Sequence, residues 1–198
     1  MLTGFFSDVH GDLASLRRAL DLLQAADEIV FLGDVAGGRE SCECIRVMQE
    51  RKIKAVKGNH DMWLFEQVGL PQDCVEALSR LPLRLAGEGF VAIHSLYTAD
   101  NGEARFRYVR THGEVDELLQ QQSAPTIFIG HTHEPALHQK RGSDGKLLSC
   151  RLREYFDFLL DSSNRHVVNV GSADSCVVLY NTVSRTLSYR FVKDDHTC

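Results

Sequence analysis

The sequence predicts an α/β protein built as one domain. Short apolar runs alternate with segments of helical periodicity through the first half of the chain, and strand-like runs dominate the last third. A length of 198 residues is usual for one α/β domain, and no internal repeat or low-complexity linker divides the chain. We therefore expect a single domain over residues 1–198, in which antiparallel strands extend an alternating strand–helix core.

The first half supplies three strands and the helices between them. Asp12 is suited to cap the first helix, in which leucines recur at helical spacing. Gly69 and Pro71 interrupt the helical pattern of residues 62–81, so two short helices are expected there. The strands are expected at residues 3–7, 28–32 and 53–56, and the second helix at residues 41–50.

The second half is richer in strands. The polar composition of residues 101–111 predicts a loop. Residues 134–165 form a long connection, within which residues 142–145 (Gly-Ser-Asp-Gly) predict a hairpin turn and residues 151–160 a helix or strand packed over the functional site. We expect this insert to shape substrate access. The other expected elements are strands at residues 83–85, 90–93, 126–129, 167–170, 176–180 and 186–192, and a helix at residues 114–121.

The composition excludes several classes of partner. A net charge of −5 and a pI near 6.0 disfavour a nucleic acid polymer and an anionic membrane surface, while small phosphorylated molecules stay open. The N-terminus lacks the basic flank of a signal peptide, and no apolar run reaches the length of a membrane span. Six scattered cysteines without a C-x-x-C motif therefore predict reduced thiols and a cytoplasmic protein.

Short polar clusters follow the expected strands. In open α/β sheets ligands bind at the carboxyl ends of the strands, so side chains far apart in sequence can meet there. Any one of these histidines alone is more often structural than metal-binding, and a lone aspartate is often a turn residue. Their joint occurrence at successive strand ends favours one shared site. The clusters are Asp8-Val9-His10-Gly11, Gly33-Asp34, Gly58-Asn59-His60-Asp61, the lone His94, and Gly130-His131-Thr132-His133.

These clusters supply enough donors for two metal ions with positions left for water and substrate. Neutral imidazoles together with oxygen donors suit Mn, Fe or Zn better than Ca or Mg, and the lack of thiolates argues against a structural zinc site. Asp34 is the natural carboxylate to bridge the two cations. The candidate ligands are Asp8, His10, Asp34, Asn59, His94, His131 and His133.

Such a pair of metals suits phosphoryl chemistry. Two cations about 4 Å apart polarise a phosphoryl group and generate a hydroxide near neutral pH, which can attack phosphorus in line. The leaving alkoxide then needs a proton, and a histidine whose pKa lies near neutrality can supply it. His60, next to Asn59, is placed for that role.

Other polar residues receive weaker interpretations. His112 precedes a helix and is interpreted as a loop or capping residue. Arg39 either reaches a substrate phosphate or faces solvent, and Asp61 either orients His60 or caps the next helix. Three further histidines lie in polar stretches and are expected to be exposed, namely His138, His166 and His196.

From Ser7 to about Asp174 the chain resembles the calcineurin-like metallophosphoesterase superfamily, because the five clusters occur in that family's order. The resemblance implies a four-layer α/β/β/α sandwich, with two mixed β-sheets flanked by helices. It also implies that His60 is the proton donor. One metal would be held by Asp8, His10, Asp34 and His133, and the other by Asp34, Asn59, His94 and His131.

Within the superfamily, the chain is most similar to a small bacterial and archaeal phosphodiesterase-like group. That group carries a late Asn-Pro-Gly-Ser element, which reads Asn169-Val170-Gly171-Ser172 here, and we assign Asn169 no catalytic duty. The chain lacks the Asp-Arg-Gly of Ser/Thr protein phosphatases, which disfavours that branch. A non-enzymatic metal-binding scaffold of the same fold is a further alternative. Such scaffolds tend to lose the catalytic histidine, which is present here as His60.

The resulting prediction is a cytoplasmic enzyme that hydrolyses a small phosphodiester or phosphomonoester. Its nucleophile would be a hydroxide bridging two divalent metal ions, and His60 would be the general acid. Mn is favoured as the metal, ahead of Fe, Ni or Zn. The sequence leaves open the physiological substrate, the choice between mono- and diester, and whether the protein is a monomer or a homodimer.

Overall fold

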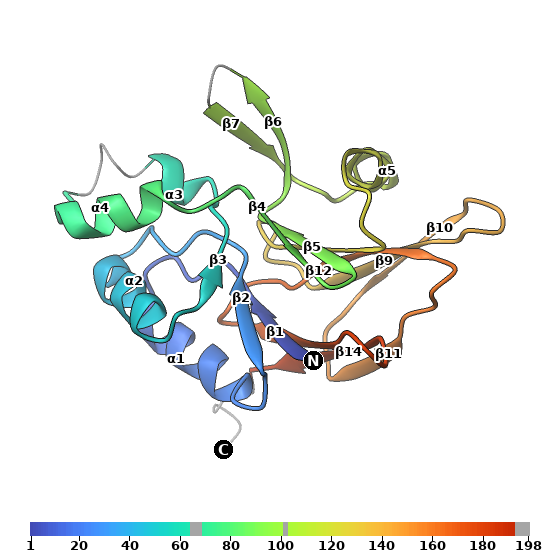
Figure 1. The fold of residues 1–198 in the computed structure, drawn as a ribbon, viewed down its shortest axis with the longest axis horizontal. Helices are drawn as coiled ribbons and strands as arrows, with labels where there is room; N and C mark the ends of the chain where they lie inside the picture. The colour runs from blue at the N-terminus through green and yellow to red at the C-terminus, as the bar shows by residue number, and fades with distance from the viewer. Residues whose placement is uncertain (64–68, 101–102, 193–198) are drawn as a thin grey trace.

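In a computed structural model of the chain, which describes residues 1–63, 69–100 and 103–192, two six-stranded sheets face each other (Figure 1). The first sheet has the order β11-β14-β13-β1-β2-β3 and the second the order β10-β9-β12-β8-β5-β4. The first sheet contains β1 (Leu2–Phe6), β2 (Glu28–Phe31), β3 (Lys54–Ala55), β11 (Phe156–Leu159), β13 (Cys176–Asn181) and β14 (Thr186–Phe191). The second contains β4 (Arg84–Gly87), β5 (Phe90–Ile93), β8 (Thr126–Ile129), β9 (Ala136–Lys140), β10 (Leu147–Arg151) and β12 (Arg165–Asn169).

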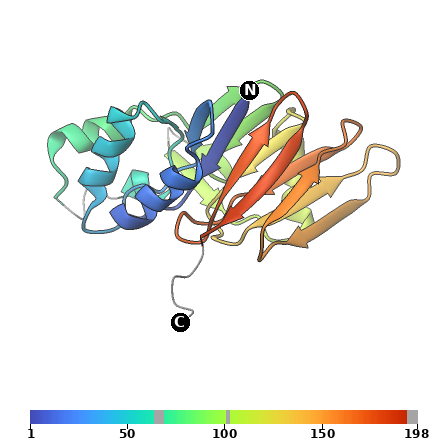
Figure 2. The same ribbon diagram turned by 90° about the horizontal axis from the view of Figure 1, so that it is seen from below.

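Both sheets are mixed. β1, β2 and β3 run parallel in the first sheet, and β5, β8 and β12 run parallel in the second. The remaining strands pair antiparallel and extend the sheets outward, as seen from below in Figure 2. The helices lie on the two outer faces, with α5 (His112–Gln121) over the second sheet (Figure 1). The helices beside the first sheet are α1 (Leu13–Leu22), α2 (Ser41–Glu50), α3 (His60–Trp63) and α4 (Gln72–Ser79).

Strand periodicity explains the layers. Successive side chains of a strand point to opposite faces, so Phe5 packs between the sheets while Phe6 packs against the helices of the first sheet. Between the sheets, Phe5 stacks on Phe128 with ring centroids 3.8 Å apart. On the outer face of the second sheet, Ile127 packs with Leu118 of α5. Three apolar layers separate four layers of secondary structure, which confirms the predicted α/β/β/α sandwich.

Most of the expected elements are confirmed. Asp12 is the N-cap of α1, and its carboxylate accepts a hydrogen bond from the Ser15 backbone N–H at 2.9 Å. The predicted hairpin turn joins β9 to β10, and residues 151–160 contain the strand β11. Residues 64–68 and 101–102, within the expected helical segment and loop, lie outside the described part of the chain. No helix in the described ranges is both long and apolar enough to cross a membrane.

Within the loop predicted at residues 101–111, the prediction is wrong at residues 103–107, which form a strand, and is confirmed at residues 108–111. β6 (Leu96–Asp100) and β7 (Glu103–Arg107) pair antiparallel as a separate hairpin that projects from the body of the molecule (Figure 1). The polar composition of this segment gave no apolar pattern typical of a strand. The reason is that the hairpin joins neither large sheet and needs few apolar side chains on its faces. Its end carries Phe106 and Tyr108 toward the functional site.

The predicted exposure of two histidines is also wrong. His138 on β9 is 7% exposed and His166 on β12 is fully buried, because both strands lie inside the second sheet. Burial lowers the pKa of each to about 4. Neither ring nitrogen of His166 has a hydrogen-bond partner among the described residues. His196, the third such histidine, lies outside the described residues.

His166 should make the fold sensitive to acid. Its folded pKa of about 4 lies below the ordinary value, so the unfolded chain binds a proton first. The stabilisation from a neutral His166 is complete above the unfolded pKa and is lost as the pH falls toward 4. At about 1.4 kcal/mol per pH unit, the free energy of unfolding should fall by about 2 kcal/mol between pH 6.5 and 5 relative to a His166→Leu variant.

This difference can be measured by urea unfolding with chelator present in both proteins, so that other titrating groups cancel. His112→Leu, at an exposed position at the start of α5, is the matched control and should keep the wild-type pH dependence. Parallel pH profiles for wild type and His166→Leu would contradict the prediction.

Candidate dinuclear metal centre

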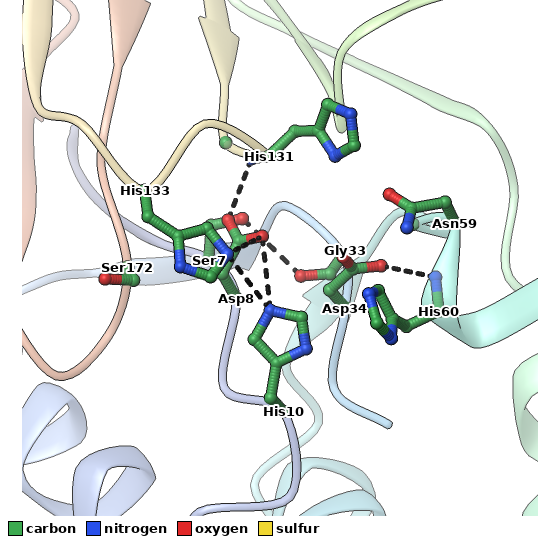
Figure 3. A network of polar contacts seen from close by, with 12 residues as sticks. Ser7, Asp8, His10, Gly33, Asp34, Asn59, His60, His131, His133 and Ser172 are labelled. Atoms are coloured by element: carbon green, nitrogen blue, oxygen red, sulfur yellow. Dashed lines mark hydrogen bonds and ion pairs between the residues drawn. The ribbon is translucent and has the colours of Figure 1, made fainter. Parts of the chain in front are cut away.

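The loops after five strands converge at one end of the sandwich (Figure 3). These strands belong to the parallel parts of the two sheets, so their carboxyl ends meet across the interface. All seven predicted ligands and His60 come together there. Asp8 and His10 follow β1, Asp34 follows β2, Asn59 and His60 follow β3, His94 follows β5, and His131 and His133 follow β8.

One cluster of donor atoms surrounds Asp8. The Nε2 atoms of His10 and His133 lie 3.1 Å apart. They lie 3.7 and 3.3 Å from Asp8 Oδ1, respectively. In Figure 3 both rings point at the Asp8 carboxylate. One cation could therefore contact all three side chains.

A second cluster surrounds His94, which is fully buried. Its Nε2 lies 3.0 Å from Asn59 Oδ1, 3.1 Å from His131 Nδ1 and 3.4 Å from Asp34 Oδ2. Its Nδ1 lies 2.7 Å from the Leu32 carbonyl, which fixes the ring and leaves Nε2 for the cluster. Two imidazoles, one amide oxygen and one carboxylate therefore face a common point.

Asp34 lies between the two clusters. Its carboxylate comes within 4.8 Å of donor atoms of His94 and His131 on one side, and of His10 and His60 on the other. It is almost fully buried, and its Oδ1 accepts a hydrogen bond from the His60 backbone N–H at 2.8 Å. This position fits a carboxylate shared by two cations.

Asp8 provides a test of whether cations fit. Its Oδ2 accepts a hydrogen bond from the His131 backbone N–H at 2.9 Å, whereas its buried Oδ1 accepts none from the described residues. A buried carboxylate oxygen without a donor is costly unless a cation contacts it. The surrounding donors are imidazoles and oxygens, as Mn, Fe or Zn prefer. The residues present therefore fit two divalent cations.

Mutual electrostatics shift the pKa values of these groups. Burial disfavours a charge on His94, but attraction by Asp34 outweighs it and raises the pKa of His94 to about 9. Burial likewise opposes the charge of Asp34, yet His94 holds the pKa of that carboxyl at about 2. Burial and the neighbouring His94 lower the pKa of His131 to about 4, while the adjacent Asp8 carboxylate raises the pKa of His133. The buried carboxylates thus attract positive charge.

The backbone of the site is strained. Seven non-glycine residues in the described ranges have a positive φ, and five of them are predicted ligands. Such left-handed conformations are uncommon outside glycine and cluster at functional sites. The remaining two are Lys52 and Arg185. The five, with φ between 49° and 69°, are Asp8, His10, Asp34, His131 and His133.

Glycines allow the loops to approach these carboxylates. A Cβ at Gly58 would lie 2.1 Å from Asp34 Oδ1, and one at Gly130 would lie 2.6 Å from Asp8 Oδ2. Both distances are far below contact, so any larger residue would displace a carboxylate. Glycine is therefore required at positions 58 and 130 by the position of the ligands.

The structure shows how Asp61, whose role its sequence position left open, is bonded. Its fully buried carboxylate accepts four backbone N–H bonds. The donors are Asp34 and Gly58 to Oδ2, at 2.8 and 2.9 Å, and Val35 and Ala36 to Oδ1, at 3.0 and 3.1 Å. Asp61 thus joins the loop after β2 to the loop after β3.

Asn169 plays a similar part for the loop after β8. Its amide nitrogen donates to Thr132 Oγ1 at 2.7 Å and to the Gly130 carbonyl at 3.3 Å. Its amide oxygen accepts from the Gly171 N–H at 3.1 Å. The Asn-Val-Gly-Ser element therefore supports the loop that carries His131 and His133.

Two aromatic residues of the site were missed by sequence reasoning. Tyr108 stacks on the His131 ring at 4.3 Å between centroids, and Phe106 packs edge-on against His94 at 5.3 Å. The available signal was the alternation of aromatic residues at positions 106 and 108 within a polar stretch. Arg39 is exposed in the loop after β2, so its contact with a substrate phosphate stays a prediction.

Comparisons with known proteins show the family and the fold of the chain. Residues 1–183 match the family model described as "Calcineurin-like phosphoesterase superfamily domain", whereas a search of curated proteins finds no match. A metallophosphoesterase from Sphaerobacter thermophilus is similar in structure, with 20% identity, a TM-score of 0.82, and coverage of 98% of this chain and 88% of that chain.

Two further structures are more distant. An archaeal phosphodiesterase has 14% identity and a TM-score of 0.57, with coverage of 97% of this chain and 100% of its own. A cold-active protein-tyrosine phosphatase from a psychrophilic Shewanella species has 15% identity and a TM-score of 0.56, with coverage of 97% and 80%. At these identities the likeness shows the fold alone, which these proteins share while differing in the activity that their names state.

Replacing Asp61 by asparagine should loosen the site. In either amide orientation an NH₂ group would face two backbone N–H donors that the carboxylate now satisfies. We expect Asp61→Asn to lower the free energy of unfolding by about 2–4 kcal/mol, measured by urea unfolding in the presence of chelator. Asp73→Asn is the control, because this exposed residue forms a surface ion pair with Arg46 at 3.3 Å and should change stability by less than about 1 kcal/mol. Equal midpoints for Asp61→Asn and wild type would refute the role of Asp61.

Proposed function

The chain belongs to the calcineurin-like phosphoesterase superfamily, and on that premise we propose that it is a dinuclear metal-dependent hydrolase of a small phosphodiester or phosphomonoester. The observation that carries the proposal is the pair of donor clusters that share Asp34. A structural metal site would have no need of two adjacent clusters with a histidine, His60, beside the shared carboxylate. The proposed metal is Mn, with Fe, Ni or Zn as alternatives.

When bound, two divalent cations would polarise a phosphoryl group and make water nucleophilic near neutral pH. The chain would hold one of them with Asp8, His10 and His133, and the other with Asn59, His94 and His131, while Asp34 is shared. Burial of Asp8 and Asp34 keeps their carboxylates directed at the site and away from bulk water. The left-handed backbone at five of these positions supports the proposal, because strain of this kind is retained where geometry is functional.

His60 is the proposed proton donor to the leaving alkoxide. Its ring packs edge-on against His10 with centroids 4.6 Å apart, and its backbone N–H donates to Asp34. The imidazole is therefore held next to both clusters, on the loop that also carries Asn59 (Figure 3). A half-buried histidine in this position can transfer a proton and exchange it with solvent.

The first test is metal stoichiometry. Calorimetric titration of the chelator-treated protein with Mn should find two ions per chain. Asp34→Asn should weaken both binding events, because the shared carboxylate contacts both clusters, while Asp8→Asn should weaken only one. Asp144→Asn in the exposed β9–β10 turn is the control. A single site in the wild-type protein, or equal effects of Asp34→Asn and Asp8→Asn, would count against the dinuclear proposal.

The second test is hydrolysis. The Mn-loaded protein should hydrolyse 4-nitrophenyl phosphate or bis(4-nitrophenyl) phosphate, and chelator should abolish the activity. Assays with Mn, Ni and Zn on both esters address metal and substrate type together. A non-enzymatic scaffold would bind metal and hydrolyse neither ester.

The third test isolates His60. Replacing it by glutamine should lower kcat by about 10²–10⁴ for an ester with a poor leaving group such as phenol, with two Mn ions still bound. The loss should be smaller for 4-nitrophenolate, because that leaving group needs little protonation. His112→Gln is the matched control at an exposed position. An equal loss for both leaving groups would indicate that His60 acts otherwise than as a general acid.

A further inference from the structure

A cavity of about 180 Å³ opens beside the loop that carries His131 and His133. Thr132 and Glu134 line the cavity, and in the sequence each is adjacent to one or both of those histidines. The same loop therefore contributes to the cavity and to the candidate metal centre. The β9–β10 hairpin forms another wall, and the connection from β7 to α5 closes the rim. The polar side chains of the lining are Arg110, Thr132, Glu134, His138, Ser149, Arg151 and Asn169.

A stack of three side chains links the cavity to the metal centre. Tyr108 lies nearly parallel to the His131 ring, with an interplanar angle of 14°. The guanidinium of Arg110 lies over the Tyr108 ring, 4.3 Å from its centroid. The stack thereby holds the Arg110 guanidinium in a fixed position relative to His131, a predicted metal ligand.

The cavity carries positive charge that is available to a ligand. Arg110 forms no ion pair with a carboxylate among the described residues. Arg151 contacts Glu134 at 3.4 Å, but this pair is exposed at the rim and therefore weak. A substrate oxyanion could replace Glu134 as the partner of Arg151, because guanidinium groups bind carboxylate and phosphate in a bidentate geometry.

The inner wall is neutral. His138 Nδ1 lies 2.8 Å from Ser149 Oγ, and burial lowers the pKa of His138 to about 4, so the ring is uncharged at neutral pH. The volume of about 180 Å³ is below the roughly 300–1,000 Å³ typical of complete ligand pockets. The cavity thus fits one part of a substrate, such as a ring of phenyl or sugar size.

We propose that this cavity binds the leaving group of the substrate, and that Arg110 and Arg151 recognise a second oxyanion carried by that group. The inference rests on the proposed phosphoesterase function. It defines the substrate class as phosphoesters whose leaving group bears a carboxylate or a further phosphate. It also gives the 134–165 insert a role in specificity, because its hairpin supplies Arg151, His138 and Ser149.

Binding of non-hydrolysable phosphonates tests the proposal separately from catalysis. The probes are phenylphosphonate, 4-carboxyphenylphosphonate and benzene-1,4-diphosphonate, titrated calorimetrically into the Mn-loaded full-length chain. Each charged probe should bind about tenfold or more tightly than phenylphosphonate, because charge-assisted hydrogen bonds to guanidinium are strong. The two charged probes distinguish a preference for carboxylate from one for phosphate.

Variants of the cavity arginines and of Glu134 test which residues cause the preference for the charged probes. In the double variant Arg110→Gln/Arg151→Gln, the ratio of dissociation constants between phenylphosphonate and the charged probes should fall toward one. Glu134→Gln should increase the ratio, because it removes the anion that competes for Arg151. Arg153→Gln is the matched control, an exposed arginine near Arg151 that is absent from the cavity lining, and it should keep the wild-type ratio.

Variants of Tyr108 provide an independent test of the same proposal. Tyr108→Ala should reduce the ratio by releasing Arg110, and Tyr108→Phe should restore it by keeping the stack. Equal affinity of wild type for all three phosphonates, or a preference that survives the double arginine variant, would overturn the inference. If the preference holds but neither aryl phosphate is hydrolysed, the phosphoesterase proposal fails while anion recognition by the cavity stands.

Discussion

The candidate metal centre depends on one buried carboxylate that is not itself among the predicted ligands. Asp61 accepts backbone N–H bonds from both the loop after β2 and the loop after β3. Burial and the repulsion of nearby Asp34 raise the pKa of Asp61, and the four donors oppose that shift. One of these donors is the N–H of Asp34 itself, so the Asp61 carboxylate helps fix the shared ligand in its left-handed conformation. Together with the bond from the His60 N–H to Asp34, this connection sets the position of Asn59 relative to Asp34.

The same constraint explains why glycine, strain and burial occur together. The two clusters contain two carboxylates and four imidazoles, so the loops that carry them must pass very close to one another. A side chain would block this approach at positions 58 and 130, and both positions are therefore glycine. The close approach also requires residues other than glycine to adopt positive φ, which costs on the order of 1 kcal/mol each. The sandwich provides compensation, because each loop is anchored on a strand of a well-packed sheet, as with β1, whose Phe5 and Phe6 are fully buried. Cation binding at Asp8 and Asp34 would add to that compensation.

The sequence predicted features that depend on local patterns and on the meeting of strand ends. Apolar runs located the central strands, and polar residues at their carboxyl ends located the site, because parallel strands bring such ends together. Features set by tertiary pairing could not be predicted in this way. His138 and His166 look polar in sequence, yet neighbouring strands bury them. Three of the four bonds of Asp61 span 25 to 27 residues. Tyr108 and His131 are 23 residues apart, so no local pattern encodes these contacts.

The candidate metal centre and the neighbouring cavity are built from different parts of the architecture. The candidate ligands follow central parallel strands, where a shift of one residue would move a donor out of its cluster. The cavity is lined from β9 and β10, which pair antiparallel at the edge of the second sheet, and from the connection that follows the β6–β7 hairpin. An edge hairpin can change its residues while the central strands keep their register. The substrate selection that we propose for Arg110 and Arg151 would therefore vary independently of the metal ligands.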